Sequence, residues 1–314
     1  MEKHFNKILP DIVTAINNNY TNSDLLLGKS DKQLPMRSII IEILNDLKQL
    51  MFPGYFSSDR IDANNASYYA GQMLSALHHK LKKQIALALA YDKDENITST
   101  SAIIQENAEN MCCRFLTAIP IIQEMLLLDV QAGYDGDPAA DSREQIIFSY
   151  PGFYAIFVYR IAHELYNMKV PFIPRIMTEH AHNKTGIDIN AGATIGKYFF
   201  MDHGTGIVIG ETTVIGDYVK LYQGVTLGAL STRGGQHLSG VRRHPTIEDN
   251  VTIYSNATIL GGETVIGRES VIGGGAFITN SIPPKTRVSV TPPDLSIKNE
   301  SKTELSATSY IYEI

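Results

Sequence analysis

The sequence predicts an α+β protein, in which a bundle of helices is followed by a solenoid of parallel strands. Two observations predict this fold class. Apolar residues recur three and four positions apart within residues 1–183, and they recur six positions apart over residues 184–284. The first spacing marks one face of a helix. A period of six matches neither a helix nor a half-buried strand, and it is typical of a solenoid whose triangular coils each contain three short strands.

The six-residue period begins in the stretch from Gly186 to Gly228 and resumes near residue 247. One apolar residue per strand points inward, and Gly, Asn or Asp at the corners tolerates the positive φ that a tight turn requires. So many positions in phase argue against an accidental repeat. The apolar positions are Ile189, Ile195, Met201 and Ile207, then Ile209, Ile215, Leu221 and Leu227, then Ile247, Ile253 and Ile259, and finally Leu260, Ile266, Ile272 and Ile278.

Between Leu227 and Ile247 the period stops. This segment is rich in Gly, Ser and Arg and contains no apolar run, so we expect a loop that leaves the solenoid wall. Loops of more than about 12–15 residues in a compact domain are usually functional or disordered. From Lys285 the period is lost again and a polar run follows, which predicts a flexible tail over residues 285–314.

The helical spacing is clearest between Ile104 and Leu126, and similar stretches cover residues 38–50, 68–91 and 152–168. We expect these helices to form a bundle that covers the first coil of the solenoid, because an uncovered coil would expose apolar edges. The predicted domains are therefore a helical domain over residues 1–183 and a β-solenoid domain over residues 184–284.

Charge and composition exclude several classes of partner. The net charge of −6 argues against a general nucleic-acid or anionic-membrane surface. The N-terminus lacks the apolar core of a signal peptide, and no apolar run approaches the ~20 residues that span a bilayer. The two cysteines, Cys112 and Cys113, are adjacent and suggest no disulfide framework, so we expect a cytoplasmic protein.

The solenoid carries one candidate acid–base pair, Asp188 and His203. An imidazole can accept a proton near neutral pH, and a carboxylate usually orients it. One coil takes about eighteen residues. Because Asp188 precedes His203 by slightly less than that, the two residues belong to neighbouring levels and are able to meet. The alternative is a solvated histidine at a corner of the solenoid.

Two further groups are candidates for substrate binding. Arg243 and His244 lie in the loop, where a guanidinium can hold a carboxylate through two hydrogen bonds. Asp137 lies in an Asp-Gly-Asp-Pro sequence ahead of the solenoid. Each group has a plain alternative, which is a solvated basic loop for the first and an ordinary turn for the second.

Together these segments resemble the serine O-acetyltransferases, which are hexapeptide-repeat acyltransferases that open cysteine biosynthesis. The repeats alone would indicate only the superfamily, whose coils form a left-handed parallel β-helix and depart from the usual right-handed crossover. The combination with the helical segment, the Asp-His pair and the loop is specific to the narrower family. The matching segments are DPA at Asp137–Ala139, GFYAIFVYRIAH at Gly152–His163, DIN at Asp188–Asn190, MDHGTGIVIGET at Met201–Thr212, VTLG at Val225–Gly228 and RHP at Arg243–Pro245.

The resemblance implies the reaction and a role for each candidate. The enzyme would transfer the acetyl group of acetyl-CoA to the hydroxyl of L-serine. His203 would be the general base that removes the hydroxyl proton, and Asp188 would orient it. The residues that would bind serine are Asp137 and Asp202 for the amine, and Arg243 with His244 beside it for the carboxylate.

The resemblance also implies partners. The subunits would form trimers, alone or as dimers of trimers, with each active site between two adjacent subunits. L-cysteine is expected as a feedback inhibitor, and the terminal Ile314 is expected to enter the active site of O-acetylserine sulfhydrylase. No metal is expected. The residues that would line the acetyl-CoA groove are Gly228, Ala229, Ser255 and Gly274.

Three alternatives remain open on the sequence. A sugar or antibiotic O-acetyltransferase would share the coils and a histidine, but it would not be expected to keep the Asp137 segment. A γ-class carbonic anhydrase would need three zinc-binding histidines, for which only His203, His237 and His244 are candidates. An inactive scaffold is disfavoured by the joint presence of Asp188, His203, Arg243 and Asp137.

Overall fold

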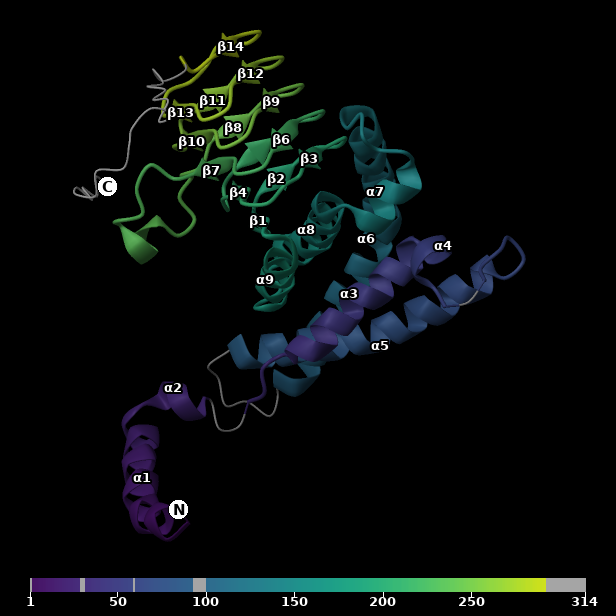
Figure 1. Cartoon of the computed structure of the whole chain (residues 1–314). Coiled ribbons are helices and arrows are strands. Elements are labelled where there is room, and N and C mark those ends of the chain that lie inside the picture. The colour runs from purple at the N-terminus through teal and green to yellow at the C-terminus, as the bar shows by residue number, and fades with distance from the viewer. Residues whose placement is uncertain (1, 29–31, 59, 93–99, 292–314) are drawn as a thin grey trace, which may run out of the picture.

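The computed structural model describes residues 2–28, 32–58, 60–92 and 100–291. Among these residues the helices come first and the strands follow, in the order that the sequence predicts (Figure 1). The helices are α1 (Glu2–Asn22), α2 (Asp24–Leu27), α3 (Arg37–Met51), α4 (Pro53–Phe56), α5 (Ala66–Asp92), α6 (Thr100–Gly136), α7 (Arg143–Ser149), α8 (Pro151–Asn167) and α9 (Ile173–Thr185).

Helices α3, α5 and α6 form the predicted bundle and cover three of the predicted helical stretches, and α8 covers the fourth, residues 152–168. Buried apolar residues lie three and four positions apart on each helix, such as Ile40, Leu44 and Leu47 on α3. Leu81 on α5 and Phe115 on α6 are fully buried against them. Helix α1 lies apart from the bundle in Figure 1, and its apolar side chains are largely exposed.

Helix α6 is long and apolar enough, by length and composition only, to cross a membrane over Ala102–Gly136. This differs from the expectation that no apolar run approaches the length that spans a bilayer. One face of α6 packs in the bundle through Ala108, Phe115 and Leu126, each with no exposed surface. Core helices pass the same length test, so we interpret α6 as part of the bundle.

The strands form the three faces of a solenoid, and all their pairings are parallel. Each strand pairs with the strand of the next coil, so that Asp188 lies opposite Val208 and Met201 lies opposite Leu221. The first sheet contains β1 (Asp188–Ile189), β4 (Val208–Ile209), β7 (Thr226–Gly228), β10 (Thr258–Leu260) and β13 (Phe277–Ile278); the second contains β2 (Thr194–Ile195), β5 (Val214–Ile215), β8 (Thr246–Ile247) and β11 (Val265–Ile266); the third contains β3 (Phe200–Asp202), β6 (Lys220–Tyr222), β9 (Thr252–Ile253), β12 (Val271–Ile272) and β14 (Arg287–Val288).

The six-residue period is confirmed by the interior of the solenoid. Along the first sheet, Ile189, Ile209, Leu227, Ile259 and Ile278 occupy equivalent positions in successive coils, and all are buried. Their stacking removes apolar surface from water, which is the main stabilising contribution to such a coil.

The corners between the second and third sheets differ from expectation. The predicted corner residues were Gly, Asn and Asp, but Tyr198, Tyr218, Glu269 and Lys285 have φ of 59–60° there, alongside Asn250. This conformation is uncommon for residues other than Gly. Backbone hydrogen bonds between neighbouring coils hold these corners, such as the one from Tyr218 N to Lys197 O, so the stack imposes the conformation whatever the side chain.

The loop lies where the sequence predicts it, whereas the solenoid ends later than expected. A loop leaves the wall between β7 and β8, as predicted, and contains one turn of 3₁₀ helix, η1 (Gly235–Leu238). Strand β14 pairs with β12, so the solenoid continues past residue 284, where we expected it to end. The predicted tail from residue 292 onward lies outside the described residues.

Helix α8 covers the first coil, as predicted. The hydroxyl of Tyr159 donates to Ala193 O at 2.6 Å, and Arg160 donates to Ile195 O and Gly196 O. These carbonyls lie beside β2, the edge strand of the second sheet, where no further strand among the described residues pairs with them. Arg160 also forms a two-point ion pair with Asp129 of α6, with N–O distances of 2.6 and 2.8 Å. The helices therefore satisfy the polar groups that a bare first coil would expose.

Candidate active site

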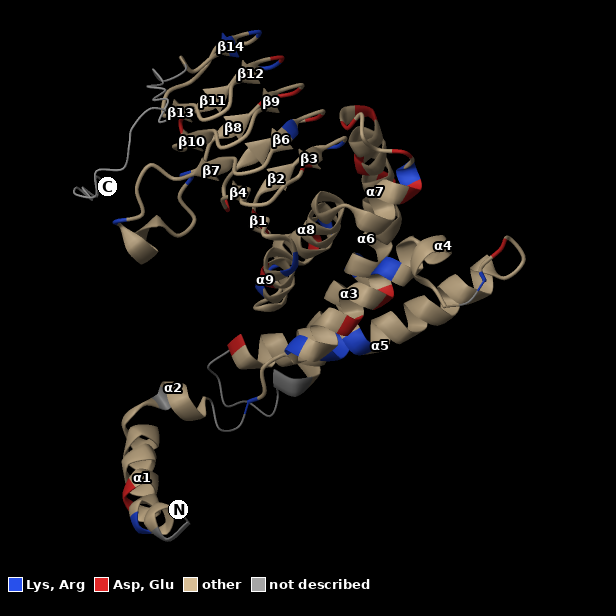
Figure 2. Cartoon of the chain, viewed as in Figure 1, with Lys and Arg blue, Asp and Glu red and all other residues tan. Residues whose placement is uncertain are grey.

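The predicted acid–base residues gather at one corner of the solenoid, between the third and first sheets. Asp202 ends β3 and His203 follows it at the turn, with a positive φ of 58°. Asp188 begins β1 on the adjoining face. His203 Nδ1 lies 3.8 Å from Asp202 Oδ1, and its side chain is 72% exposed. Figure 2 shows that most charged residues of the solenoid lie at the turns between its strands.

The structure does not give Asp188 the contact that we predicted for it. Among the described residues, no hydrogen bond joins Asp188 to His203, and the carboxylate nearest the imidazole is that of Asp202, at 3.8 Å. Catalytic hydrogen bonds are often long until substrate is bound. The orienting role of Asp188 therefore stays a prediction.

The helical segment brings Asp137 to this same corner. Its carboxylate accepts hydrogen bonds from the Tyr150 hydroxyl at 2.6 Å and from Ala139 N at 2.8 Å. The Tyr150 hydrogen bond, then the Ala139 amide and the charges of Lys220 and His203, hold the pKa of Asp137 below its usual value. Burial, with the hydrogen bond to Asp137, raises the pKa of Tyr150 to about 12. Asp137 is thus an anion at neutral pH and can bind an ammonium group.

Lys220 joins Asp202 to the end of α6 at this corner, and sequence reasoning missed it. Its Nζ lies 3.4 Å from Asp202 Oδ2 and donates to Gly136 O at 2.5 Å. The ammonium therefore holds the end of α6, next to Asp137, against β3. The spacing of one coil would not have identified it, because Lys220 lies opposite Phe200 and Tyr222 lies opposite Asp202.

Arg243 and His244 lie at a different corner, between the first and second sheets. Arg243 Nη2 lies 2.5 Å from Glu211 Oε2, and the hydroxyl of Tyr166 donates to Glu211 Oε1 at 2.9 Å. Burial alone would raise the pKa of Glu211, but the hydrogen bonds from Arg243 and Tyr166 lower it overall. An ionised Glu211 therefore fixes the guanidinium of Arg243.

His244 is buried beside this pair. Its Nδ1 accepts a hydrogen bond from Thr212 N at 3.1 Å, so the proton of the neutral ring lies on Nε2. Burial, then the charge of Arg243, lowers the pKa of His244. The side chain is a neutral donor at neutral pH. Glu211 and Thr212 belong to the quoted Met201–Thr212 segment, but their roles were visible only in three dimensions.

Within one chain the six predicted catalytic and substrate-binding residues thus form two groups. They are separated by β4, which forms one face of the coil between the turn at His203 and the turn at Glu211. The first group lies between the third and first sheets and consists of Asp137, Asp188, Asp202 and His203. The second group lies between the first and second sheets and consists of Arg243 and His244.

The residues predicted for acetyl-CoA are divided in the same way. Ser255 and Gly274 lie in successive coils at the corner of His203, where Gly275 N donates to Ser255 O at 2.9 Å. Gly228 ends β7, and Ala229 follows it at the corner of Arg243. A row of turns connects His203 to Ser255 along one corner, through the hydrogen bonds of Gly224 N to Thr205 O and Asn256 N to Gln223 O.

One group of potential metal ligands lies in the bundle, away from both corners. The ligand atoms of His78, Glu109 and Cys113 lie within 4.8 Å of one another. Glu109 already pairs with Lys82 at 2.6 Å. The hydrogen bonds from Lys82 and His78 lower the pKa of Glu109 to about 2. This group has no contact with the predicted site residues.

Comparison with known proteins decides the family. A family model described as "Serine acetyltransferase, N-terminal" matches residues 62–157. A plasmid-encoded serine acetyltransferase of Synechococcus elongatus is 42% identical over 250 residues, which cover 77% of this chain and 78% of the relative. The chain belongs to the serine acetyltransferase family.

Solved serine acetyltransferases share the fold. Serine acetyltransferase 1 of Entamoeba histolytica, solved in complex with L-cysteine, is 35% identical with a TM-score of 0.68, over 82% of this chain and 88% of that one. The enzyme of Neisseria gonorrhoeae, solved with serine, is 26% identical with a TM-score of 0.53, over 80% and 95%. The predicted α+β fold, with a left-handed parallel β-helix after the helices, is confirmed, and so is the resemblance to this family.

The position of His244 depends on Gly210, whose missing side chain leaves room for the imidazole. A Cβ at Gly210 would lie 2.0 Å from His244 Cδ2 and 2.2 Å from Nε2. We expect Gly210→Ala to displace the imidazole and to lower kcat/KM for serine by about tenfold, or roughly 1.4 kcal/mol. Steady-state kinetics would measure this.

The matched control for Gly210 is Gly71→Ala in α5, where an added Cβ meets nothing within 4 Å. It should keep wild-type kinetics. If Gly210→Ala also kept wild-type kcat/KM, the position of His244 beside the substrate would be wrong.

Proposed function

We propose that this chain transfers the acetyl group of acetyl-CoA to the hydroxyl of L-serine in the cytoplasm, giving O-acetyl-L-serine and CoA for cysteine biosynthesis. The observation that carries the proposal is the corner where the carboxylates of Asp137 and Asp202 lie beside the imidazole of His203. Two carboxylates beside one imidazole suit a substrate that offers an ammonium group next to a hydroxyl. Membership of the serine acetyltransferase family supports this over the alternative, a sugar or another small hydroxyl acceptor.

The mechanism assigns one task to each group. Asp137 and Asp202 bind the serine ammonium, so that the hydroxyl lies against the exposed imidazole of His203. The imidazole takes the hydroxyl proton as the oxygen attacks the thioester carbonyl, and Asp188 steadies its charge. The tetrahedral intermediate then expels CoA thiolate, which takes up the proton from His203. Such general-base assistance typically contributes about 10²–10⁴-fold.

The acetyl donor would lie along the row of turns that connects His203 with Ser255 and Gly274. A row of turns along one corner suits the extended shape of CoA. In this position the thioester would lie at one end of the row of turns, beside His203. Gly228 and Ala229 would contact the donor from the other corner group, and no metal is needed in any of these steps.

We further propose that the complete site forms between two subunits of a homotrimer, alone or within a dimer of trimers. Within one chain, β4 separates His203 from Arg243. Serine is too small for its amine and carboxylate to reach both corners of one coil. In a trimer, the Arg243 corner of one subunit would face the His203 corner of the next, and Arg243 and His244 would bind the serine carboxylate.

The proposed activity is tested by acetyl transfer with purified protein. With acetyl-CoA as donor, CoA release should depend on L-serine, and a panel of sugars should give no release above background. Release with a sugar and none with L-serine would overturn the proposal in favour of the alternative acceptor. Sedimentation of the same sample tests the trimer.

L-cysteine is expected to compete with L-serine, because it offers the same amine and carboxylate with a thiol in place of the hydroxyl. Arg243→Ala should weaken both ligands together, each by about tenfold or more. Inhibition kinetics with serine varied would measure both effects. Uncompetitive inhibition, or inhibition that Arg243→Ala leaves unchanged, would contradict a shared site.

The C-terminal residue Ile314 is expected to bind O-acetylserine sulfhydrylase through its side chain and α-carboxylate. The last six residues are unusually apolar after a polar run, and a terminal carboxylate on a branched residue resembles an amino acid. Deleting Ile314 should weaken binding by about tenfold, or roughly 1.4 kcal/mol, without loss of serine acetylation. Calorimetry would measure the affinity, and unchanged binding by the truncated chain would disprove the contact.

A further inference from the structure

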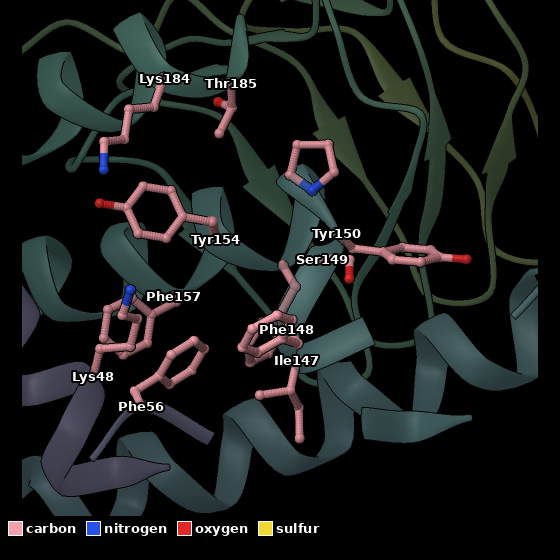
Figure 3. Close-up of a pocket in the computed structure, with 12 residues that line it drawn as sticks. Lys48, Phe56, Ile147, Phe148, Ser149, Tyr150, Tyr154, Phe157, Lys184 and Thr185 are labelled. Atoms are coloured by element: carbon pink, nitrogen blue, oxygen red, sulfur yellow. The ribbon is translucent and has the colours of Figure 1, made fainter. Parts of the chain in front are cut away.

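A cavity lies where the helical bundle meets the helices that cover the first coil (Figure 3). Its volume is about 250 Å³, large enough for a small organic molecule. It is separate from both groups of predicted site residues, although Tyr150 forms part of its wall. The lining residues are Lys48, Phe56, Ile147, Phe148, Ser149, Tyr150, Pro151, Phe153, Tyr154, Phe157, Lys184 and Thr185.

The lining is aromatic and carries two positive charges. No Asp or Glu is among the lining residues. Lys48 Nζ lies 4.4 Å from the centre of the Phe56 ring, and Lys184 Nζ lies 5.4 Å from the centre of the Tyr154 ring. Among the described residues, neither ammonium forms an ion pair with a carboxylate. The aromatic rings compensate these cations only in part.

The two cations also repel each other. Lys48 Nζ lies 6.0 Å from the centre of the same Tyr154 ring that Lys184 contacts. Burial, then the charge of Lys184, lowers the pKa of Lys48. A half-buried cation without a counter-charge is costly, and an anion between the two ammonium groups would remove this cost.

The aromatic walls provide a surface for a flat apolar group. The rings of Phe56 and Phe148 are stacked, with centroids 5.9 Å apart and planes 9° apart. Phe148 is nevertheless 67% exposed. Tyr154 and Phe157 form a second stacked pair on α8. Binding sites for small molecules commonly combine an apolar lining with a few charged groups that fix orientation.

The cavity is connected to the active-site corner through Tyr150. Figure 3 shows its ring directed away from Lys48 and Lys184, and its hydroxyl donates to Asp137 at 2.6 Å. Its neighbours Ser149 and Pro151 line the cavity. Gly152 follows against β3, where a Cβ would lie 2.6 Å from Met201 O. The turn between α7 and α8 is therefore packed between the cavity and the residues before His203.

We propose that this cavity binds a small organic anion with an aromatic body, and that its occupant changes the binding of the amino-acid substrate through Tyr150. The binding itself does not depend on the proposed enzymatic function, whereas the coupling does. An effector acts by binding two states of a protein unequally, and a turn that holds both the occupant and Asp137 can transmit that difference.

Calorimetry with phenyl phosphate tests the binding. We expect a Kd of about 1 mM or lower, and binding about tenfold weaker for phenol and for inorganic phosphate, each of which lacks one half of the probe. Lys48→Gln and Lys184→Gln should each weaken phenyl phosphate by about fivefold or more. The matched control is Lys169→Gln, since Lys169 also lies over a ring, that of Tyr166, but outside the cavity.

Three results would overturn the binding site. They are no heat of binding with the folded wild-type protein up to about 10 mM, equal affinity for phenol and phenyl phosphate, and wild-type affinity in both cavity variants. Thermal unfolding of each variant would establish that it is folded.

Serine kinetics with phenyl phosphate present test the coupling. We expect the KM for serine to change by about threefold or more in the wild-type protein. The change should disappear in Tyr150→Phe, which keeps the ring and loses the hydrogen bond to Asp137. An unchanged KM with the cavity occupied would overturn the coupling. If the protein did not acetylate serine at all, the proposed function would fail, and calorimetry would still decide the binding site.

Discussion

Replacing His203 by alanine is expected to lower kcat for serine acetylation by about 10²–10⁴-fold, which is the usual contribution of a general base. The stability of the fold should change little, because the side chain is 72% exposed at a corner of the solenoid. Steady-state kinetics with acetyl-CoA and L-serine would measure the first effect, and thermal unfolding would measure the second.

Two further variants separate the base from the turn. His203 has a positive φ of 58°, a conformation that asparagine tolerates better than alanine does. His203→Asn should therefore preserve the corner and still lose turnover. His237→Ala, at an exposed histidine of the loop, should keep wild-type kcat. Asp188→Asn should lose less than His203→Ala, since the base would remain. Near wild-type turnover in His203→Ala would show that another group is the base.

Replacing Asp129 by alanine is expected to lower the free energy of unfolding by about 3–5 kcal/mol, because it leaves the buried Arg160 charge without a counter-charge. The side chains are only 1% and 4% exposed. Asp129 also accepts a hydrogen bond from Phe199 N at 2.9 Å. The variant would thus weaken the joint between α6, α8 and the first coil. Denaturant unfolding would measure the loss.

A double substitution distinguishes the charge from the packing. Asp129→Leu with Arg160→Met removes both charges, so it should cost less than the sum of the two single substitutions. Exposed ion pairs are worth far less, so Arg175→Ala, which removes the exposed pair with Glu179, should change stability by less than about 1 kcal/mol. If Asp129→Ala were as mild as Arg175→Ala, the buried pair would not stabilise this joint.

Much of the fold was predictable because it depends on local repetition. One inward residue in every six, from Ile189 to Ile278, predicted the coils. The spacing around Phe115 predicted a helix. The corners were less predictable, since Tyr198 and Glu269 adopt a conformation that their own preferences disfavour and that the neighbouring coils impose. Strand β14 was missed because Val288 is out of phase with the six-residue period that ends at Ile278, and the strand is recognised only from its pairing with β12.

The sequence by itself determined the fold class, the family and the residue types of the site, because each depends on motifs that are contiguous in the chain. Only the tertiary structure decided how these residues are grouped. Side chains far apart in the sequence meet only when coils and helices pack, which is how Tyr150 and Lys220 come to hold Asp137 and Asp202. The same packing separates His203 from Arg243 across one face of the coil, and it creates the cavity with Lys48 and Lys184 from two helices that are distant in the sequence.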